Sequence, residues 1–507
     1  MLNYKIFNFS KNLLKLSSII ITLVSFICCS DMMNNYSIKD ILTNTVPPAY
    51  TSMMINNNDS YTYSRNATVQ LNVTDAAQMQ FSDDSGTTWT SWEPYSNSKS
   101  WKLKLGTSTK IVQGRFRKSD TSIISLSDDI VFCERLIASD GVINKISDFR
   151  KEGYGSSLSL SSDGKILAAG HEADMLGLGH YTGSVYIYTW NTVTETWSES
   201  KITAADINTC SSFGRNVTLS ADGITLAVSD PNNTEYSGGA VYIFKWNGAA
   251  WNQIQKIGFT INSIHRAEYL PVALSGNGNS LVIGNNRDNW HTNPPATNVH
   301  YDGAIYIYDY NSINYNGNKH IPITGDLNNG IGVSISQDGN TIISTPHITF
   351  QTMFIYRRNG LNWDATEYHA SALDAMFTFT PKISSDGSIV LTGGESFIRN
   401  ISWDGSNWNH ASLYPSDENL VHHYRKISSN NSCTKFVATE EYYSDFHLFN
   451  YNGSSWTSKK YESPDGNSDD RFPNTSAMSD TLVFAVSNSH HLRADGEYIG
   501  EIFIYRE

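Results

Sequence analysis

The chain has 507 residues, enough for roughly two to four domains with a sizeable hydrophobic core. It carries 36 lysines and arginines against 49 aspartates and glutamates, a net charge of −13, which excludes a nucleic-acid-binding protein that works through a basic surface. Charged residues make up only 17% and aromatic residues reach 12%, a composition that favours strands and turns over helices.

The N-terminal residues have the pattern of an export signal. Three lysines lie ahead of an apolar run at residues 16–27 (LSSIIITLVSFI), and Cys28 and Cys29 follow it directly. A membrane-spanning helix takes about 20 residues, so this run of 12 residues fits the apolar core of a signal peptide. We therefore set residues 1–29 apart from the folded protein.

This segment resembles a bacterial lipoprotein signal, in which a cysteine after the apolar run receives the lipid and becomes the new N-terminus. The resemblance implies lipidation of Cys29, with Cys28 as the alternative, and an exported protein held at the cell envelope, outer membrane or cell surface. The residues before Cys29 relax the usual pattern, and plain secretion with cleavage nearby is the competing interpretation. Residues 30–45 are polar and predict a tether.

The remaining cysteines do not predict a covalent framework. Cys133, Cys210 and Cys433 are odd in number and far apart in the sequence, which argues against a set of disulfides. There is no C-x-x-C or Cys/His spacing of the kind that binds zinc. We expect each cysteine to be a small buried apolar residue.

Residues 46–131 predict a small β-sandwich. Apolar and polar residues alternate at 67–73 (ATVQLNV), and the same pattern returns in three further short segments separated by turn residues, at 78–81, 101–105 and 111–116. Such spacing predicts an immunoglobulin-like β-sandwich. The stretches 75–82 and 89–95 also resemble an immunoglobulin-like module of bacterial surface proteins, which implies a spacer or presenting domain rather than a catalyst.

Residues 82–89 (SDDSGTTW) fit the Asp-box pattern of sialidases, S-x-D-x-G-x-T-W. Its chemistry is local: the Asp84 carboxylate accepts turn amides, Gly86 permits positive φ and Trp89 caps the hairpin. The motif occurs once, outside the repeats described next, and no arginine cluster for a sialic carboxylate accompanies it. We therefore interpret it as a turn and not as a sign of sialidase activity.

The rest of the chain contains seven copies of one unit. The unit consists of an apolar strand, a Ser-x-Asp-Gly turn, a second apolar strand, a variable loop, a strand of the type VYIY and an outer strand that starts with Trp; copy three lacks the Trp and copy seven the outer strand. The copies are spaced by 45 to 61 residues when they are aligned on the turn, at Asp163, Asp222, Asn277, Asp338, Asp386, Asn431 and Asp480.

Four strands per copy, Asn-Gly hairpins and no helix pattern predict a seven-bladed β-propeller over residues 132–507. One blade cannot bury both of its faces, so neighbouring blades must stack around a ring. The last copy ends without an outer strand. We expect residues of about 130–137 to supply it and to close the ring, although residues 130–132 can also be read as the last sandwich strand.

The copies carry a family resemblance. Phe213-Gly214, the turn at 219–223 (LSADG) and the strand at 239–244 (GAVYIF) resemble the FG-GAP repeats of bacterial exported proteins, relatives of the integrin α-subunit propeller. Calcium sites of that family need a carboxylate-rich D-x-D-x-D-G loop, whereas each turn here has one acid, so we expect no metal. The signatures of WD repeats and kelch repeats are missing from the sequence. A propeller of another family remains an alternative interpretation.

In a propeller, the loops between second and third strands share a face with the connections between blades. The long loops of the first, third and seventh copies combine aromatic and polar residues that suit a glycan or a protein. Loops also collect insertions without function. The candidate ligand-binding residues of this rim are Asp174, His180, Tyr181, Trp290, His291, His300, Tyr301, His490, His491 and Arg493.

No serine-nucleophile elbow, zinc-protease, P-loop or dinucleotide motif is present, so no catalytic residue and no cofactor is expected. The sequence favours a non-enzymatic, lipid-anchored surface protein whose propeller binds an extracellular protein or glycan. We expect it to be a monomer and not to bind nucleic acid. The alternative is a propeller glycoside hydrolase or lyase with Asp174, Glu440 or Glu441 as general acid and base.

Overall fold

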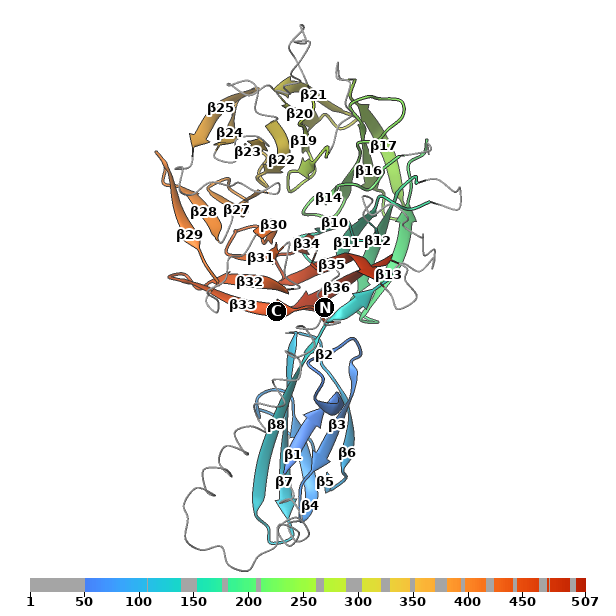
Figure 1. Ribbon diagram of the computed structural model, residues 1–507, viewed down its shortest axis with the longest axis vertical. Helices are drawn as coiled ribbons and strands as arrows, with labels where there is room; N and C mark the ends of the chain where they lie inside the picture. Colours follow the sequence, from blue (N-terminus) through green and yellow to red (C-terminus); the bar gives the residue numbers. More distant parts are fainter. Residues whose placement is uncertain are drawn as a thin grey trace, which may run out of the picture. The chain divides into compact units, whose positions relative to one another are not determined.

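The computed structural model describes residues 51–106, 108–137, 153–175, 181–206, 211–260, 269–288, 303–320, 329–346, 352–369, 381–393, 397–415, 424–440, 445–464, 472–473, 475–492 and 498–507. In this part of the chain the protein is all-β (Figure 1), apart from one 3-10 turn, η1 (Asn56–Asn58). Within the same residues, no helix has the length and apolar character needed to cross a membrane.

The chain separates into two compact units. The smaller unit draws on residues up to Asn57, on Thr68–Trp101 and on Val112–Asp128. The larger unit draws on Asn58–Ala67, Lys102–Ile111 and Asp129–Glu507. Two short segments inside the range expected for the sandwich therefore group with the larger unit.

The first eight strands form two sheets, ordered β1-β3-β6 and β2-β8-β7-β4-β5. Alternation of apolar and polar residues produces them: in β3, Ala67, Val69 and Leu71 are buried while their neighbours face outward. The strands expected near residues 67–73, 78–81 and 111–116 are thereby confirmed, whereas the strand expected at 101–105 lies earlier and ends at Lys102. The eight strands are β1 (Ser52–Ile55), β2 (Tyr61–Thr62), β3 (Asn66–Asn72), β4 (Ala76–Ser82), β5 (Glu93–Pro94), β6 (Ser98–Lys102), β7 (Thr109–Lys118) and β8 (Ile123–Phe132).

The Asp-box segment is a turn with the predicted contacts. The Asp84 carboxylate accepts a hydrogen bond from the Thr88 amide at 2.8 Å. Gly86 has a φ of 82°, and the Trp89 indole nitrogen donates to the Gly86 carbonyl at 2.9 Å. Both of these hydrogen bonds join residues of the same turn, which agrees with a structural role.

Among the residues that the structure describes, the larger unit contains seven four-stranded antiparallel sheets. Their strands follow chain order from the centre of the ring outward (Figure 1). The first four sheets consist of β10 (Ser157–Leu160), β11 (Ile166–His171), β12 (Ser184–Asn191) and β13 (Thr196–Ile202); β14 (Val217–Leu219), β15 (Thr225–Asp230), β16 (Ala240–Trp246) and β17 (Trp251–Gly258); β18 (Val272–Leu274), β19 (Ser280–Asn285), β20 (Ala304–Tyr310) and β21 (Tyr315–His320); and β22 (Asn329–Ile335), β23 (Thr341–Pro346), β24 (Thr352–Asn359) and β25 (Asn362–His369).

The last three sheets continue the pattern, with one exception in the seventh. Its outer strand is β9, which comes from ahead of the first sheet and pairs with β36. The three sheets consist of β26 (Lys382–Ile383), β27 (Ile389–Gly393), β28 (Ile398–Trp403) and β29 (Trp408–Leu413); β30 (Tyr424–Ser429), β31 (Lys435–Glu440), β32 (Asp445–Tyr451) and β33 (Trp456–Glu462); and β34 (Thr475–Met478), β35 (Val483–Leu492), β36 (Tyr498–Arg506) and β9 (Glu134–Leu136).

The pairing of β9 with β36 places Phe503 opposite Arg135, with Ile502 opposite Leu136 and Ile504 opposite Glu134. The two readings of this stretch are both correct, because β8 ends at Phe132 and β9 begins two residues later. Cys133 lies between them, buried and free; Cys433 is likewise buried and free, as predicted. Burial raises the pKa of the Cys133 thiol to about 12, so it stays protonated at neutral pH.

Apolar side chains fill the spaces between successive sheets. One cluster joins Val185 of the first sheet to Leu226 of the second, and similar clusters follow between each sheet and the next. A further cluster joins Ile502 of the seventh sheet to Leu167 of the first. The core is thus a series of layers between sheets, which is the packing of a β-propeller.

The turns between first and second strands, here called the inner turns, are hydrogen-bonded to one another. The Ser162 amide donates to the Ala221 carbonyl, and the series continues through turns two to six by backbone bonds. Asp480 of the seventh turn accepts from the Asn431 amide at 2.7 Å and donates its own amide to the Ser162 carbonyl at 3.0 Å. Every inner turn is therefore bonded to the next, and the seventh to the first.

These bonds correct the alignment of the last two copies. By hydrogen-bonding role, Asn431 and Asp480 occupy the position of Ser162, one residue ahead of the position of Asp163. The capping position of the seventh turn is instead taken by Thr481, whose hydroxyl lies 3.1 Å from that of Ser479. The seventh turn is one residue shorter than the first. In the sequence, Asp480 therefore cannot be told from an aspartate at the capping position.

Candidate functional site

Antiparallel order gives the sheets of the larger unit two distinct ends. The rim end holds the segments between second and third strands and the connections from each sheet to the next. The turn end holds the inner turns and the hairpins between third and fourth strands. The ligand-binding residues predicted from the sequence were all drawn from the expected loops between second and third strands.

Most of these predicted residues lie outside the described part of the chain: Cys28, Cys29, His180, Trp290, His291, His300, Tyr301, Arg493 and Glu441. The backbone of His490 and His491 belongs to β35, and Glu440 is the last residue of β31. Asp174 and Tyr181 are described with their side chains. They come from one segment, between β11 and β12, where Tyr181 is half-buried.

Asp174 is buried beneath the rim and does not face solvent, with an exposure of 1%. Its carboxylate accepts hydrogen bonds from the Ser184 hydroxyl at 2.6 Å and pairs with the Lys201 ammonium at 2.7 Å. Its backbone carbonyl accepts from the amides of Thr182 and Gly183. Asp174 therefore anchors the segment between β11 and β12 and is not positioned to contact a ligand at the surface.

The same kind of anchor recurs in other sheets. A cation at one register position of the outer strand reaches a buried carboxylate: Lys319 pairs with Asp288 at 2.8 Å, and Lys460 with Asp445 at 2.8 Å. In the seventh sheet, Arg135 of β9 pairs with Glu501. A buried carboxylate is tolerated when a cation and hydrogen bonds compensate it. These acids are structural supports of the rim end.

In the second sheet the corresponding lysine, Lys256, has surface partners. Its ammonium contacts Asp206 and, at 2.7 Å, Glu235. Burial lowers the pKa of Lys256, but the hydrogen bonds to these two carboxylates outweigh it and raise the pKa above its ordinary value. A sequence signal existed for this pattern: an aromatic residue at the start of an outer strand is followed four residues later by lysine, as in Trp197 and Lys201.

One exposed aromatic pair at the rim end was missed by the sequence analysis. Tyr414 follows β29 and is 64% exposed, and its ring centroid lies 6.2 Å from that of Phe397, a half-buried residue directly before β28. Because the loop before Phe397 is short, the search of long loops did not reach it. The two rings meet only because Ile398 and Leu413 pair across the sheet.

In the first two inner turns, the acid side chains are used within their own turns. Asp163 accepts from the Ser161 hydroxyl and the Lys165 amide, and the same two contacts recur at Asp222 with Ser220 and Ile224. Of the residues described, no group of three or more histidine, cysteine or acidic side chains is placed to hold a metal ion. The carboxylates of Asp163 and Asp222 therefore stabilise the turns in which they lie by accepting hydrogen bonds from them.

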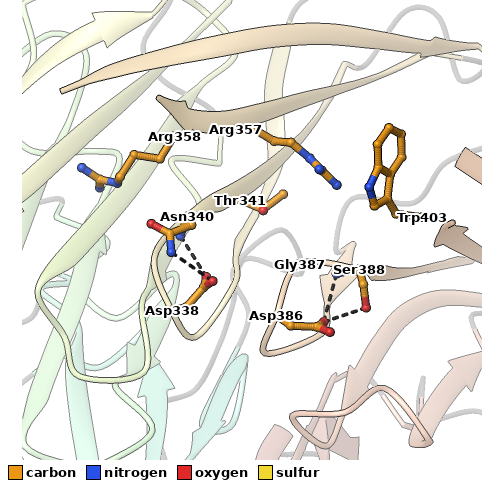
Figure 2. Close-up of a pocket in the computed structure, with 9 residues that line it drawn as sticks. All are labelled: Asp338, Asn340, Thr341, Arg357, Arg358, Asp386, Gly387, Ser388 and Trp403. Atoms are coloured by element: carbon orange, nitrogen blue, oxygen red, sulfur yellow. Dashed lines mark hydrogen bonds between the residues drawn. The ribbon is translucent and has the colours of Figure 1, made fainter. Parts of the chain in front are cut away.

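The turn end contains a groove between the fourth and fifth sheets, with a volume of about 270 Å³. Figure 2 shows Arg357 extending toward Trp403 above Asp386 and Ser388, while Arg358 points away from them. The Arg357 guanidinium lies 4.3 Å from the Trp403 ring centroid and 5.4 Å from that of Trp408. The remaining residues that line the groove are Asp338, Asn340, Thr341 and Gly387.

A second cavity, of about 320 Å³, lies between the outer strands of the first and second sheets. Its one charged lining residue is Lys201, which is already paired with Asp174. Trp251 and Phe244 supply its apolar wall. The uncharged polar lining residues are Thr203, Asn252 and Gln253.

Comparison with known proteins supports the fold. Residues 197–244 match the family model of the FG-GAP repeat, from outer strand β13 through the first three strands of the second sheet. No curated protein sequence matches the chain.

Three solved structures are similar to this chain. They are the β-propeller domain of Cps50 (Swd1) from Myceliophteria thermophila (11% identity, 70% of this chain and 97% of that one, TM-score 0.46), hydrazine synthase from Kuenenia stuttgartiensis (11%, 71% and 98%, 0.47) and the periplasmic gluconolactonase PpgL from Pseudomonas aeruginosa (12%, 76% and 96%, 0.42). The strand order, the layered core and the repeat match together show that this chain contains a β-propeller with an FG-GAP repeat.

Proposed function

We propose that this protein is an exported, lipid-anchored binding protein of the cell envelope. In this proposal, an N-terminal immunoglobulin-like sandwich presents a closed, seven-bladed propeller, and the rim end of the propeller binds an extracellular protein or glycan. The lipid on Cys29, or on Cys28, holds the protein at the membrane.

The observation that carries the proposal is the contrast between the two ends of the sheets. At the turn end, the inner turns are short, alike and bonded to one another. At the rim end, the spacing between second and third strands varies widely: β11 ends at His171 and β12 begins at Ser184, whereas β19 ends at Asn285 and β20 begins at Ala304. Variable segments on a rigid base are the usual arrangement of a recognition surface.

The buried ion pairs strengthen this contrast. Asp174, Asp288, Asp445 and Glu501 secure the strand ends next to the variable segments through lysine or arginine. A base secured in this way limits the conformational entropy lost on binding. The proposed contact residues are Tyr181, His180, Trp290, His291, His300, Tyr301, His490, His491 and Arg493, with the exposed Tyr414 added from the structure.

The geometry favours binding over glycan hydrolysis. A general acid must lie within hydrogen-bonding reach of the scissile bond. Asp174 is buried and held by Lys201 and Ser184, so it cannot reach a substrate at the surface.

Arrays of glycans and extracellular proteins, probed with the chain that begins at Ser30, test the binding proposal. We expect retention of a defined glycan or protein, and a strong loss in the double variant Trp290→Ala/Tyr301→Ala. The matched control is Leu361→Ser, which removes a 98% exposed apolar side chain at the turn end. Silence across both arrays, or equal binding by the rim variant, would contradict the proposal.

Metabolic labelling with a fatty acid tests the anchor separately. We expect the label and the membrane fraction to be lost in Cys29→Ser and kept in Cys28→Ser. Label that is lost only in Cys28→Ser would move the site by one residue. A wild-type protein that remains unlabelled and soluble would contradict the lipid anchor while leaving the binding test intact.

A further inference from the structure

We propose that the groove between the fourth and fifth sheets binds one neutral sugar ring. Arg357 donates hydrogen bonds to the sugar hydroxyls, Asp386 accepts from them and Trp403 supplies an apolar edge. The groove lies at the turn end, so the proposal stands independently of the rim.

Arg357 is the hydrogen-bond donor of the proposed site. Its guanidinium stacks over Trp403 and makes no hydrogen bond or ion pair with any residue that the structure describes. A guanidinium carries five N–H donors in one plane, and stacking on a ring leaves the edges of that plane unused. The cation is therefore held in place with its donors available at the groove.

Neighbouring arginines show that this state is specific to the groove. Arg358, the next residue, makes two bonds with the Asp309 carboxylate at 2.8 and 2.9 Å. Arg506 stacks over Trp190 in the same manner as Arg357 over Trp403, but it also contacts Glu134 at 3.4 Å. Arg357 has the same stacking contact, and Asp364, its cross-strand neighbour, accepts instead from the Asn359 side-chain amide at 2.9 Å and forms no ion pair with Arg357.

Asp386, on the inner turn of the fifth sheet, is the hydrogen-bond acceptor of the proposed site. One oxygen of Asp386, Oδ1, accepts from the Ser384 hydroxyl and from the amide and hydroxyl of Ser388. Its other oxygen, Oδ2, bonds to none of the described residues. The hydrogen bond from Ser384 holds the pKa of Asp386 below its ordinary value, so the free oxygen is that of a carboxylate.

Charge selects the class of ligand. Asp338 and Asp386 both line the groove, whereas Arg358 is neutralised by Asp309, which leaves Arg357 as the one uncompensated cation among the lining residues. Two carboxylates against one guanidinium disfavour an anionic ligand. A neutral ligand with hydroxyl groups satisfies both partners, since a hydroxyl donates to a carboxylate and accepts from a guanidinium.

The volume of the groove and the partial exposure of Trp403 fit a single sugar ring. A volume of about 270 Å³ lies at the small end of ligand sites, which suits one sugar ring better than a peptide segment. Trp403 is half-buried, so part of its ring edge is available to the C–H groups of a sugar.

Titration calorimetry of the full chain with neutral monosaccharides and with glucuronate tests the proposal. We expect at least one neutral sugar to bind and glucuronate to bind more weakly. Arg357→Ala should weaken binding by about tenfold or more, as expected for a lost hydrogen bond to a charged group. Arg357→Lys keeps the charge but loses both the planar fork and the stacking on Trp403, and it should weaken binding as well.

The matched control is Lys245→Ala. Lys245 occupies the corresponding position in the second sheet and lies 3.5 Å from the Tyr310 ring centroid, so its loss removes a comparable contact away from the groove. We expect unchanged sugar affinity in this variant and in Trp290→Ala/Tyr301→Ala. Absence of neutral-sugar binding by the wild type, full affinity in Arg357→Ala, or preference for glucuronate would overturn the proposal.

Discussion

At the scale of single residues, the contact between adjacent sheets explains the glycines of the repeat. Gly214 has a φ of 94°, and a Cβ added there would lie 2.4 Å from the Ser184 carbonyl oxygen of the preceding sheet. Gly183 forms a parallel bridge with Phe213, and its Cβ would lie 2.0 Å from the Phe213 carbonyl oxygen. The Phe-Gly pair of one copy and the glycine before the third strand of the previous copy thus permit close backbone approach.

Gly214→Ala should destabilise the protein by about 3 kcal/mol or more, because it adds a clash to an unfavourable φ. Gly248→Ala is the matched control, since Gly248 has a φ of 95° with no atom within 4 Å of the added Cβ. We expect the control to cost only about 1 kcal/mol. Denaturant unfolding measures both, and equal losses would show that the contact between sheets is unimportant.

Tyr308 predicts how stability depends on alkaline pH. Burial raises its pKa from 10.0 to about 12. Between these values the unfolded chain has lost the tyrosine proton while the folded chain keeps it, so the free energy of unfolding falls as pH rises. Tyr308→Phe should reduce that slope by up to about 1.4 kcal/mol per pH unit.

Urea unfolding across this pH window measures the slope. Tyr414→Phe is the control, because this tyrosine is 64% exposed, and it should leave the slope unchanged. A slope identical to wild type in Tyr308→Phe would contradict the protonation argument.

At the scale of elements, β9 is the shortest outer strand of the seven four-stranded sheets in the described part of the chain. It contributes three residues to the seventh sheet, whereas β13 contributes seven to the first. Side chains reinforce this short pairing: Glu134 accepts a hydrogen bond from the Trp197 indole nitrogen at 2.6 Å, and Arg135 pairs with the buried Glu501. The closing strand therefore depends on its ion pair more than a longer strand would.

Arg135→Ala should lower the free energy of unfolding by about 3 to 5 kcal/mol, because it leaves the Glu501 carboxylate buried without its cation. The double variant Arg135→Ala/Glu501→Gln should recover part of the loss, since the remaining group is neutral. Unfolding in denaturant measures both variants. A loss below about 1 kcal/mol in the single variant would show that β9 closes the sheet without help from the pair.

At the scale of the whole molecule, the inner turns and the core layers form two continuous series. Apolar clusters link every sheet to the next and the seventh to the first. Asp480 joins the sixth, seventh and first turns, since it accepts from Asn431 and, at 2.5 Å, from the Ser162 hydroxyl. Loss of one link affects the ring as a whole, because no sheet buries both faces alone.

Asp480→Ala should therefore cost more than Asp222→Ala, although both aspartates are exposed. Asp222 caps only its own turn through Ser220 and Ile224, and its loss should cost about 1 kcal/mol. We expect about 2 kcal/mol for Asp480, which bonds two neighbouring turns. Thermal unfolding ranks the two variants, and the reverse order would contradict the role of Asp480 in the ring.

The sequence alone determined the features that depend on near neighbours. Alternation predicted the strands, the Asp84 turn was predicted with its contacts, and a missing outer strand pointed to residues near Arg135. Such features follow from local backbone geometry and from the rule that a sheet edge needs a partner.

Only the tertiary structure decided which charged groups are compensated. Asp174 meets Lys201, and Arg358 meets Asp309, across strands or sheets, whereas Arg357 stacks on Trp403 and forms no ion pair with an acid in the described part of the chain. The sequence does not distinguish these groups. It shows neither which residue lies opposite each one in the sheet nor which side chains of the next sheet contact it. Burial and pairing are properties of the packed ring, and they separate a structural carboxylate from an available one.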